Sequence, residues 1–211
     1  MHALKAGFLV FATRPVSMVA TLVLAVAASV ISLGLLFFPA IAGFYLAVRE
    51  SRREEFFIDL ENVVRTVGIF FKGMQAFALG AWVLGLFGIV VSIVLLVIPV
   101  IPSIEETPAG YELGLRLSFL FIPAFWLMGS VLIHGFPNLV RGAGGWRSIT
   151  TSLKHGVRTP FLALFIGFLV LFPMTGFFFH IFMIFTYPIF VGWVLARDRQ
   201  LQLEPLKSND S

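Results

Sequence analysis

The side chains that could carry chemistry in this chain are few and widely spaced. His134 and Asn138 stand four residues apart, so a helix would place both on one face. They form a polar pair within an apolar tract, and they either line a polar site or brace a kink. Glu105, Glu106 and Glu112 could bind a divalent cation through their carboxylates, although a solvated loop explains them more simply.

No sequence pattern typical of an enzyme accompanies these residues. The chain has no Gly-x-Ser-x-Gly, His-Glu-x-x-His or Walker sequence. It has no cysteine, which excludes disulfides, thiolate metal sites and a cysteine nucleophile. We therefore expect a non-enzymatic protein with no catalytic residue, no metal and no cofactor.

A larger group of candidate residues is basic and flanks the apolar tracts. Such side chains can bind anionic lipid headgroups, each contributing about 1 kcal/mol close to the membrane surface. The simpler alternative is that they only set the orientation of the chain in the membrane. The headgroup candidates are Lys5, Arg14, Arg52, Arg53, Arg147, Lys154 and Arg158.

The composition places these residues in an integral membrane protein. Of the 211 residues 59% are hydrophobic and 12% are charged, whereas soluble domains have roughly 25% charged residues. The net charge of +4 is then better explained by membrane topology than by nucleic-acid binding. Four tracts lack any Asp, Glu, Lys or Arg and are long enough to hold membrane helices: 16–48, 73–104, 117–140 and 160–196.

The first of these tracts is too long for one membrane helix. As a single helix its 33 residues would extend ~50 Å, against ~30 Å of hydrocarbon. We therefore predict a hairpin of two short helices. Ala25–Ala27 has the spacing of a signal-peptide cleavage site, but the apolar run continues to Val48, so we expect no cleavage there.

The distribution of basic residues then predicts the topology. We take 16–48 and 160–196 as hairpins, and 73–104 and 117–140 as single helices. All of the 15 Lys and Arg residues except Arg116 then lie on one side of the membrane. This pattern is typical of cytoplasmic loops and predicts six crossings of the inner membrane with both termini cytoplasmic. The cytoplasmic segments are 1–15, 49–72, 141–159 and 197–211, and the outer loop is 102–116.

Three segments have the pattern of amphipathic helices lying at the membrane surface, and we expect them at 2–14, from about Arg52 to Lys72, and at 146–158. The second is predicted to start from the capping-box spacing of Ser51 and Glu54, with a separate span following from about Met74 to Val100. We also expect a kinked fourth span because of its prolines, an outer turn at 177–180, and a last crossing that ends at Arg197.

Two segments of the chain are similar to each other. Pro39 and Gly43 in the first hairpin recur as Pro188 and Gly192 in the last, followed in both by Leu-Ala. This favours repeat units at 3–50 and 152–198, with 51–141 between them, inside a single membrane domain covering 1–211. The four residues either form close helix contacts or face a pathway between the two hairpins.

The order of these features resembles a known group of proteins. A short Gly-containing span ends in Arg49, an amphipathic helix carries Phe56 and Leu60, and a late Ser-Leu-Lys precedes a span with Thr-Tyr-Pro. This resembles uncharacterised prokaryotic six-span proteins that are similar to the membrane domain fused to glycerophosphodiester phosphodiesterases. The resemblance implies a six-helix membrane fold and carries over no catalytic residue.

Taken together, the sequence predicts an all-α, polytopic helical bundle. We expect a membrane-embedded partner or lipid-interacting scaffold whose partners are membrane lipids, anionic ones included, a second copy of the chain or another membrane protein. The alternative is a small oligomeric transporter or channel, with its pathway between the two Pro-x-x-x-Gly hairpins.

Overall fold

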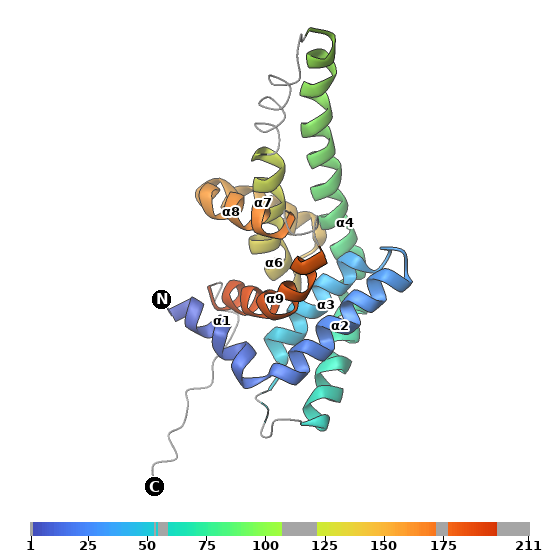
Figure 1. Ribbon diagram of the computed structural model, residues 1–211, viewed down its shortest axis with the longest axis vertical. Coiled ribbons are helices and arrows are strands. Elements are labelled where there is room, and N and C mark those ends of the chain that lie inside the picture. The colour runs from blue at the N-terminus through green and yellow to red at the C-terminus, as the bar shows by residue number, and fades with distance from the viewer. Residues whose placement is uncertain (1, 53, 55–58, 107–121, 172–176, 198–211) are drawn as a thin grey trace. The chain divides into compact units, whose positions relative to one another are not determined.

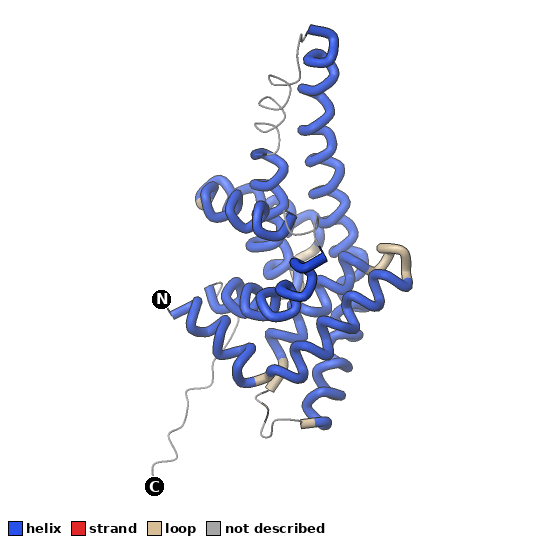
Figure 2. Tube along the Cα trace, viewed as in Figure 1, coloured by secondary structure: helices blue, strands red, loops and turns tan. Residues whose placement is uncertain are grey.

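The computed structural model describes residues 2–52, 54, 59–106, 122–171 and 177–197, and every regular element among them is helical. Figure 1 labels the α-helices, and Figure 2 shows the short loops of the described chain. The all-α prediction is therefore confirmed for this part of the chain. The helices are α1 (His2–Thr13), α2 (Pro15–Ile31), α3 (Phe37–Glu50), α4 (Leu60–Glu106), η1 (Val131–Gly135), α6 (Phe136–Val140), α7 (Gly145–Arg158), α8 (Pro160–Leu171) and α9 (Phe177–Arg197).

The chain divides into two compact units. The first contains residues 1–75 and 181–211, and the second contains residues 76–180. α4 runs through both units, and α9 enters the first after its opening turn.

In the first unit, the long apolar tract forms the predicted hairpin. α2 and α3 pack along each other and are joined by a turn at 32–36. Leu33 and Gly34 take positive φ angles there, +51° and +88°, which reverses the chain. α1 precedes this hairpin and meets α2 at an angle of 91° beside Arg14, since Pro15 starts a new helix.

Three predicted boundaries in the chain are wrong. The helix expected from Arg52 starts at Leu60, because Asp59 rather than Ser51 caps it: the Asp59 carboxylate accepts from the backbone N–H of Asn62 at 3.0 Å. That helix does not stop before a separate span but continues unbroken to Glu106. The turn expected at 177–180 is the first turn of α9.

The outer loop predicted at 102–116 also begins within a helix, because α4 continues to Glu106. The following predicted boundaries agree with the structure. α7 covers the third amphipathic segment, and α9 ends at Arg197. The fourth span is irregular as expected, because a π-helical turn, η1, interrupts it immediately before Pro137. The predicted outer loop beyond Glu106 and the start of the fourth span lie outside the described residues.

Among the described residues, one helix is long and apolar enough to cross a membrane, Leu60–Val91. A second crossing is counted if the bent pair α1–α2 is taken as one span. The six crossings stay a prediction.

Small residues mark the places where helices come closest. In the first unit, a Cβ added to Gly192 of α9 would lie 3.1 Å from the Cα of Gly7 in α1. In the same unit, a Cβ added to Gly73 of α4 would lie 2.9 Å from the Cα of Gly43 in α3. The backbones touch at these points, which is how helices associate inside a membrane.

The second unit contains contacts of the same kind. A Cβ added to Gly145 of α7 would lie 3.1 Å from the Cα of Gly80 in α4. A Cβ added to Gly135 of η1 would lie 2.6 Å from the Oγ of Ser152 in α7. Each of the three amphipathic helices thus packs through a glycine or serine: α1 on α9, α4 on α3, and α7 on η1.

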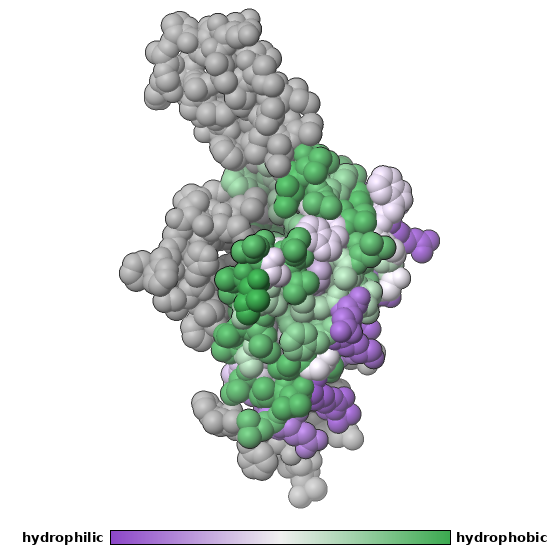
Figure 3. All heavy atoms as spheres, turned by 90° about the vertical axis from the view of Figure 1, so that its right-hand side faces the viewer, coloured by the Kyte–Doolittle hydropathy of each residue, from purple (hydrophilic) through white to green (hydrophobic). Residues whose placement is uncertain are grey.

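Several large apolar side chains of these three helices are turned outward, whereas Val10, Phe70 and Ile149 on the same helices are buried. On α1 Phe8 is exposed, on α4 Leu60 and Val64 are exposed, and on α7 Trp146 and Val157 are exposed. Hydrophobic residues, green in Figure 3, cover much of the described surface on the side shown. A water-soluble helix has the opposite arrangement, with its apolar stripe against the core.

We predict that Gly43→Ala destabilises the fold, because the added methyl group would lie 2.6 Å from the Phe70 carbonyl oxygen and 2.8 Å from the Met74 Cγ. Overpacking of this kind costs about 1–3 kcal/mol. The measurement is unfolding of the protein in mixed micelles by a denaturing detergent, followed by circular dichroism.

Gly68→Ala is the matched control on α4, because nothing lies within 4 Å of the position of its added Cβ. Alanine favours a helix over glycine by about 1 kcal/mol, so this variant should be as stable as the parent protein or more so. Equal stability of the two variants would contradict the close approach of α3 and α4.

Candidate functional site

A network of buried and half-buried polar groups, here called the polar junction, joins four segments of the first unit. It consists of Arg14, Ser17, Ser51, Glu54 and Asn62. The Glu54 carboxylate accepts from the backbone N–H of Ser17 at 2.7 Å and of Val16 at 3.4 Å. It thereby caps the N-terminus of α2, where the helix dipole favours a negative charge.

The other members of the polar junction tie this cap to α3 and α4. Asn62 of α4 donates through Nδ2 to the Arg52 carbonyl oxygen at 3.0 Å and to the Ser17 hydroxyl at 3.4 Å. The Glu54 backbone N–H donates to the Thr13 carbonyl oxygen at 3.0 Å, at the end of α1. The chain between α3 and α4 is therefore fastened to the corner between α1 and α2.

Arg14 is predicted to bind lipid headgroups, and the structure shows that it also makes contacts within the fold. Its guanidinium donates to the Ser51 hydroxyl at 2.9 Å and to the Val48 carbonyl oxygen at 3.4 Å, at the C-terminus of α3. A cation is favourable at that end of a helix. Arg14 therefore links the start of α2 to the end of α3. Its binding to a lipid headgroup stays a prediction.

In the second unit, the predicted pair His134 and Asn138 binds α7 and the residue that follows it. His134 Nε2 lies 3.3 Å from the Thr159 hydroxyl, and Asn138 donates through Nδ2 to the Thr151 hydroxyl at 3.2 Å. Trp126 donates through its indole N–H to the Gly156 carbonyl oxygen at 3.1 Å. These bonds brace the irregular helix around η1. They favour the interpretation that His134 and Asn138 brace a kink over the interpretation that they line a polar site.

The two Pro-x-x-x-Gly segments also make packing contacts with other helices. Pro39, Gly43, Pro188 and Gly192 are all buried. α3 and α9 meet in the first unit through the rings of Phe44 and Tyr187, whose centroids are 5.3 Å apart. Because each glycine lies against a neighbouring helix, this arrangement favours packing over a pathway.

α7 presents the most distinctive surface. At 3.6 residues per turn its side chains fall into three arcs. Ser148, Ile149, Ser152 and Gly156 form the buried arc, which packs against the rest of the second unit. Trp146, Leu153 and Val157 form an apolar arc beside it, and Trp146 is 72% exposed.

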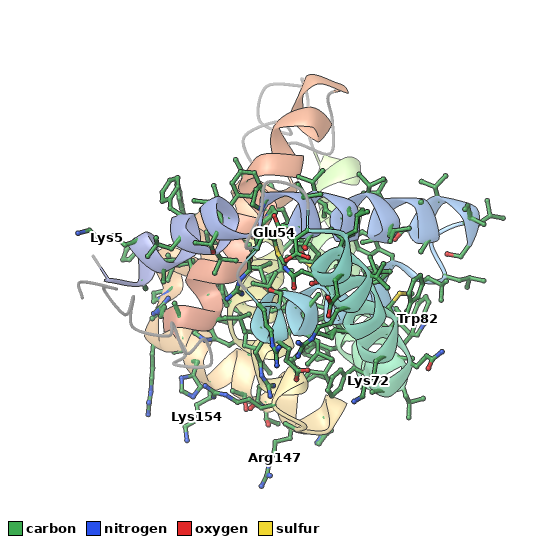
Figure 4. All side chains as sticks on the ribbon, turned by 90° about the horizontal axis from the view of Figure 1, so that it is seen from below. Lys5, Glu54, Lys72, Trp82, Arg147 and Lys154 are labelled. Atoms are coloured by element: carbon green, nitrogen blue, oxygen red, sulfur yellow. The ribbon has the colours of Figure 1, made fainter. Side chains whose placement is uncertain are left out.

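The third arc of α7 is basic and is here called the basic arc. It consists of Arg147, Lys154 and Arg158, which fall within about 40° of one another around the helix axis. All three side chains are exposed, and Figure 4 shows Arg147 and Lys154 extending away from the ribbon. α7 contains no acidic residue, so nothing on the helix itself neutralises them.

The remaining headgroup candidates are more scattered. Lys5 on α1 and Arg52 before α4 are exposed. Arg53 lies outside the described residues. The basic arc is therefore the one place in the described chain where three of the predicted side chains share a helix face.

No metal site is found in the part of the chain that the structure describes, where no three His, Asp or Glu side chains gather. No protein-family model matches this sequence, and no curated protein and no solved structure matches it either.

We predict that Glu54→Ala destabilises the protein through the loss of the α2 cap. Removing a buried, charge-assisted cap costs about 1–3 kcal/mol. Glu61→Ala is the control, because Glu61 is an exposed acid in the first turn of α4 and its loss should cost only a few tenths of a kcal/mol. Detergent-induced unfolding compares the two variants, and a Glu54 variant as stable as the Glu61 variant would contradict the role of the polar junction.

Proposed function

We propose that this protein is a non-enzymatic membrane scaffold that binds anionic lipids at the basic arc of α7. The observation that carries the proposal is the order of the arcs around α7: small residues toward the protein, apolar residues beside them, and three basic residues beyond. A helix lying in the headgroup region needs this arrangement, with its apolar side chains in the acyl boundary and its basic side chains among the phosphates.

The membrane location is part of the same proposal. The outward apolar side chains of α1, α4 and α7 and the apolar helix Leu60–Val91 support it. We propose six membrane helices in the inner membrane with both termini cytoplasmic, as the distribution of basic residues predicts. The likeness to the membrane domain fused to glycerophosphodiester phosphodiesterases fits this topology and stays a prediction.

Transport is the weaker hypothesis. Its proposed pathway runs between the two Pro-x-x-x-Gly segments, and the glycines of both segments lie against neighbouring helices. The scaffold interpretation uses the same contacts without requiring that anything pass between them. The transporter alternative stays a prediction that no contact in the described chain favours.

We predict that removing charge from the basic arc selectively weakens anionic-lipid binding. In Arg147→Gln/Lys154→Gln, two side chains worth about 1 kcal/mol each are lost, so the preference for phosphatidylglycerol over phosphatidylcholine should fall roughly thirtyfold. The measurement is native mass spectrometry of the purified protein with defined amounts of each lipid.

Arg65→Gln/Lys72→Gln is the matched control, because it removes the same charge from exposed positions on α4, where Asp59 and Glu61 partly neutralise the helix. Its lipid preference should change by less than about threefold, which corresponds to less than 1 kcal/mol. If both double variants lose the preference equally, net charge rather than the basic arc binds the lipid, and the proposed site is wrong.

Cysteine labelling tests the proposed topology, and the chain has no native cysteine that would also react. A membrane-impermeant maleimide should label Arg52→Cys and Arg147→Cys only from the cytoplasmic side. It should label Glu105→Cys only from the outer side, because α4 connects residue 60 to residue 106 as one helix. Labelling of residue 105 from the cytoplasm would contradict the proposed orientation.

A further inference from the structure

The tip of the α2–α3 hairpin combines features that a turn in water does not have. Its side chains are apolar apart from Ser32 and Gly34, and they are turned outward: Leu33 is 94% exposed and Ile31 is 83% exposed. Neighbouring Val30, Leu35 and Leu36 are exposed as well. No charged residue occurs between Val16 and Val48.

The backbone N–H groups of the tip all have hydrogen-bond partners. Each of the six N–H groups from Ser32 to Phe37 donates to an acceptor within the hairpin. Five donate to carbonyl oxygens, at 2.7–3.1 Å, and the Leu36 N–H donates to the Ser32 hydroxyl oxygen at 2.9 Å. A turn in water can leave backbone N–H groups to bind solvent, whereas a turn in hydrocarbon cannot leave them unpaired.

The side-chain hydroxyl groups of Ser32 in the tip and of Ser29 just before it also bind the backbone. The Ser29 hydroxyl donates to the Ala25 carbonyl oxygen at 2.8 Å, and the Ser32 hydroxyl donates to the Ser29 carbonyl oxygen at 3.2 Å. Both hydroxyl groups are thereby turned back onto the backbone. The surface of the tip consists mainly of hydrocarbon.

Leu33 is an unusual choice for its backbone conformation. Its φ angle of +51° is left-handed, which costs an L-residue about 1–2 kcal/mol and is normally occupied by Gly, Asn or Asp. A polar residue would relieve that strain in a turn exposed to water. A leucine at this position fits a turn whose surroundings are apolar.

The lengths of the two helices limit how deep the tip can lie. The apolar part of α3, Phe37–Val48, has 12 residues and extends about 18 Å from Arg49, whereas the hydrocarbon core is about 30 Å thick. Arg14 fastens α2 to the C-terminal end of α3 through Ser51 and Val48, so both helices start from the same level. The tip therefore ends inside the hydrocarbon before reaching the far surface.

We propose that the α2–α3 hairpin is a re-entrant membrane element whose tip, Val30–Leu36, is covered by lipid acyl chains. It enters from the cytoplasmic side and returns to it, so the first two of the six membrane helices are not complete crossings. The orientation of the chain is unchanged, because such a hairpin starts and ends on the same side. This inference rests on the membrane location proposed above.

The test uses nitroxide spin labels on single-cysteine variants of the full chain in phosphatidylcholine–phosphatidylglycerol vesicles. Labels at Leu33→Cys and Leu35→Cys report on the tip. A label at Leu79→Cys reports on α4, where Leu79 is exposed on the candidate crossing helix. Power saturation measures the collision of each label with oxygen, which is enriched in hydrocarbon, and with a water-soluble nickel chelate present on both sides.

A lipid-covered tip gives high oxygen collision and low nickel collision at both tip positions, comparable with those at Leu79. High nickel collision at the tip with a lipid-exposed Leu79 would show that the hairpin crosses the membrane completely. Low collision with both reagents would show that protein, such as a second copy of the chain, covers the tip. Either result overturns the re-entrant hairpin and leaves the membrane location intact, whereas high nickel collision at Leu79 as well would overturn the membrane location itself.

Leu33→Asp provides a second measurement that does not depend on labelling. A carboxylate near the middle of the hydrocarbon reduces insertion roughly 100-fold. Trp146→Asp is the comparison, because Trp146 belongs to the interfacial helix α7 and a charge there remains within reach of water. If both variants are recovered from the membrane fraction in equal yield, the tip does not lie in hydrocarbon.

Discussion

Close contact between helix backbones at glycine and serine is the interaction on which the rest of this structure depends. Gly7 with Gly192, Gly43 with Gly73, and Gly80 with Gly145 let pairs of helices touch along their main chains. Some large apolar side chains of the same helices are buried, such as Phe44, Phe70 and Leu84. Others turn outward, such as Phe8, Leu79 and Trp146. In water the outward side chains would expose hydrocarbon at a cost of about 25 cal/mol per Å², which supports our proposal that something apolar covers them.

Lipid is the covering that fits the distribution of polar groups. The basic residues of α7 lie beside its apolar arc, as a helix at the headgroup level requires. The polar junction performs a related task in the first unit, since Arg14, Glu54 and Asn62 bring four segments together where the chain changes direction. Buried polar groups at such corners satisfy the helix ends that a membrane environment would leave unpaired.

The positions of the helices could be predicted from the sequence better than the contacts between the helices. The apolar tracts and their charges gave the hairpin at 16–48, the amphipathic helix at 146–158 and the end at Arg197, because periodicity and length are local properties. Ser51–Glu54 misled the prediction, since the capping-box spacing is also local while Glu54 binds Ser17, 37 residues away. No short-range signal ties those two residues together. Likewise, an apolar stripe does not say whether it faces the protein, and only the packing of Ser148, Ser152 and Gly156 shows which side of α7 does so.

Quenching of Trp146 by brominated lipids tests the central claim, that the outward apolar arc of α7 is immersed in the membrane boundary. Replacing Trp82, Trp126 and Trp193 by Phe leaves Trp146 as the only indole. The account predicts strong quenching by lipids brominated in the upper part of the acyl chain and weak quenching by acrylamide from water. Strong acrylamide quenching of Trp146 without quenching by the brominated lipids would contradict it.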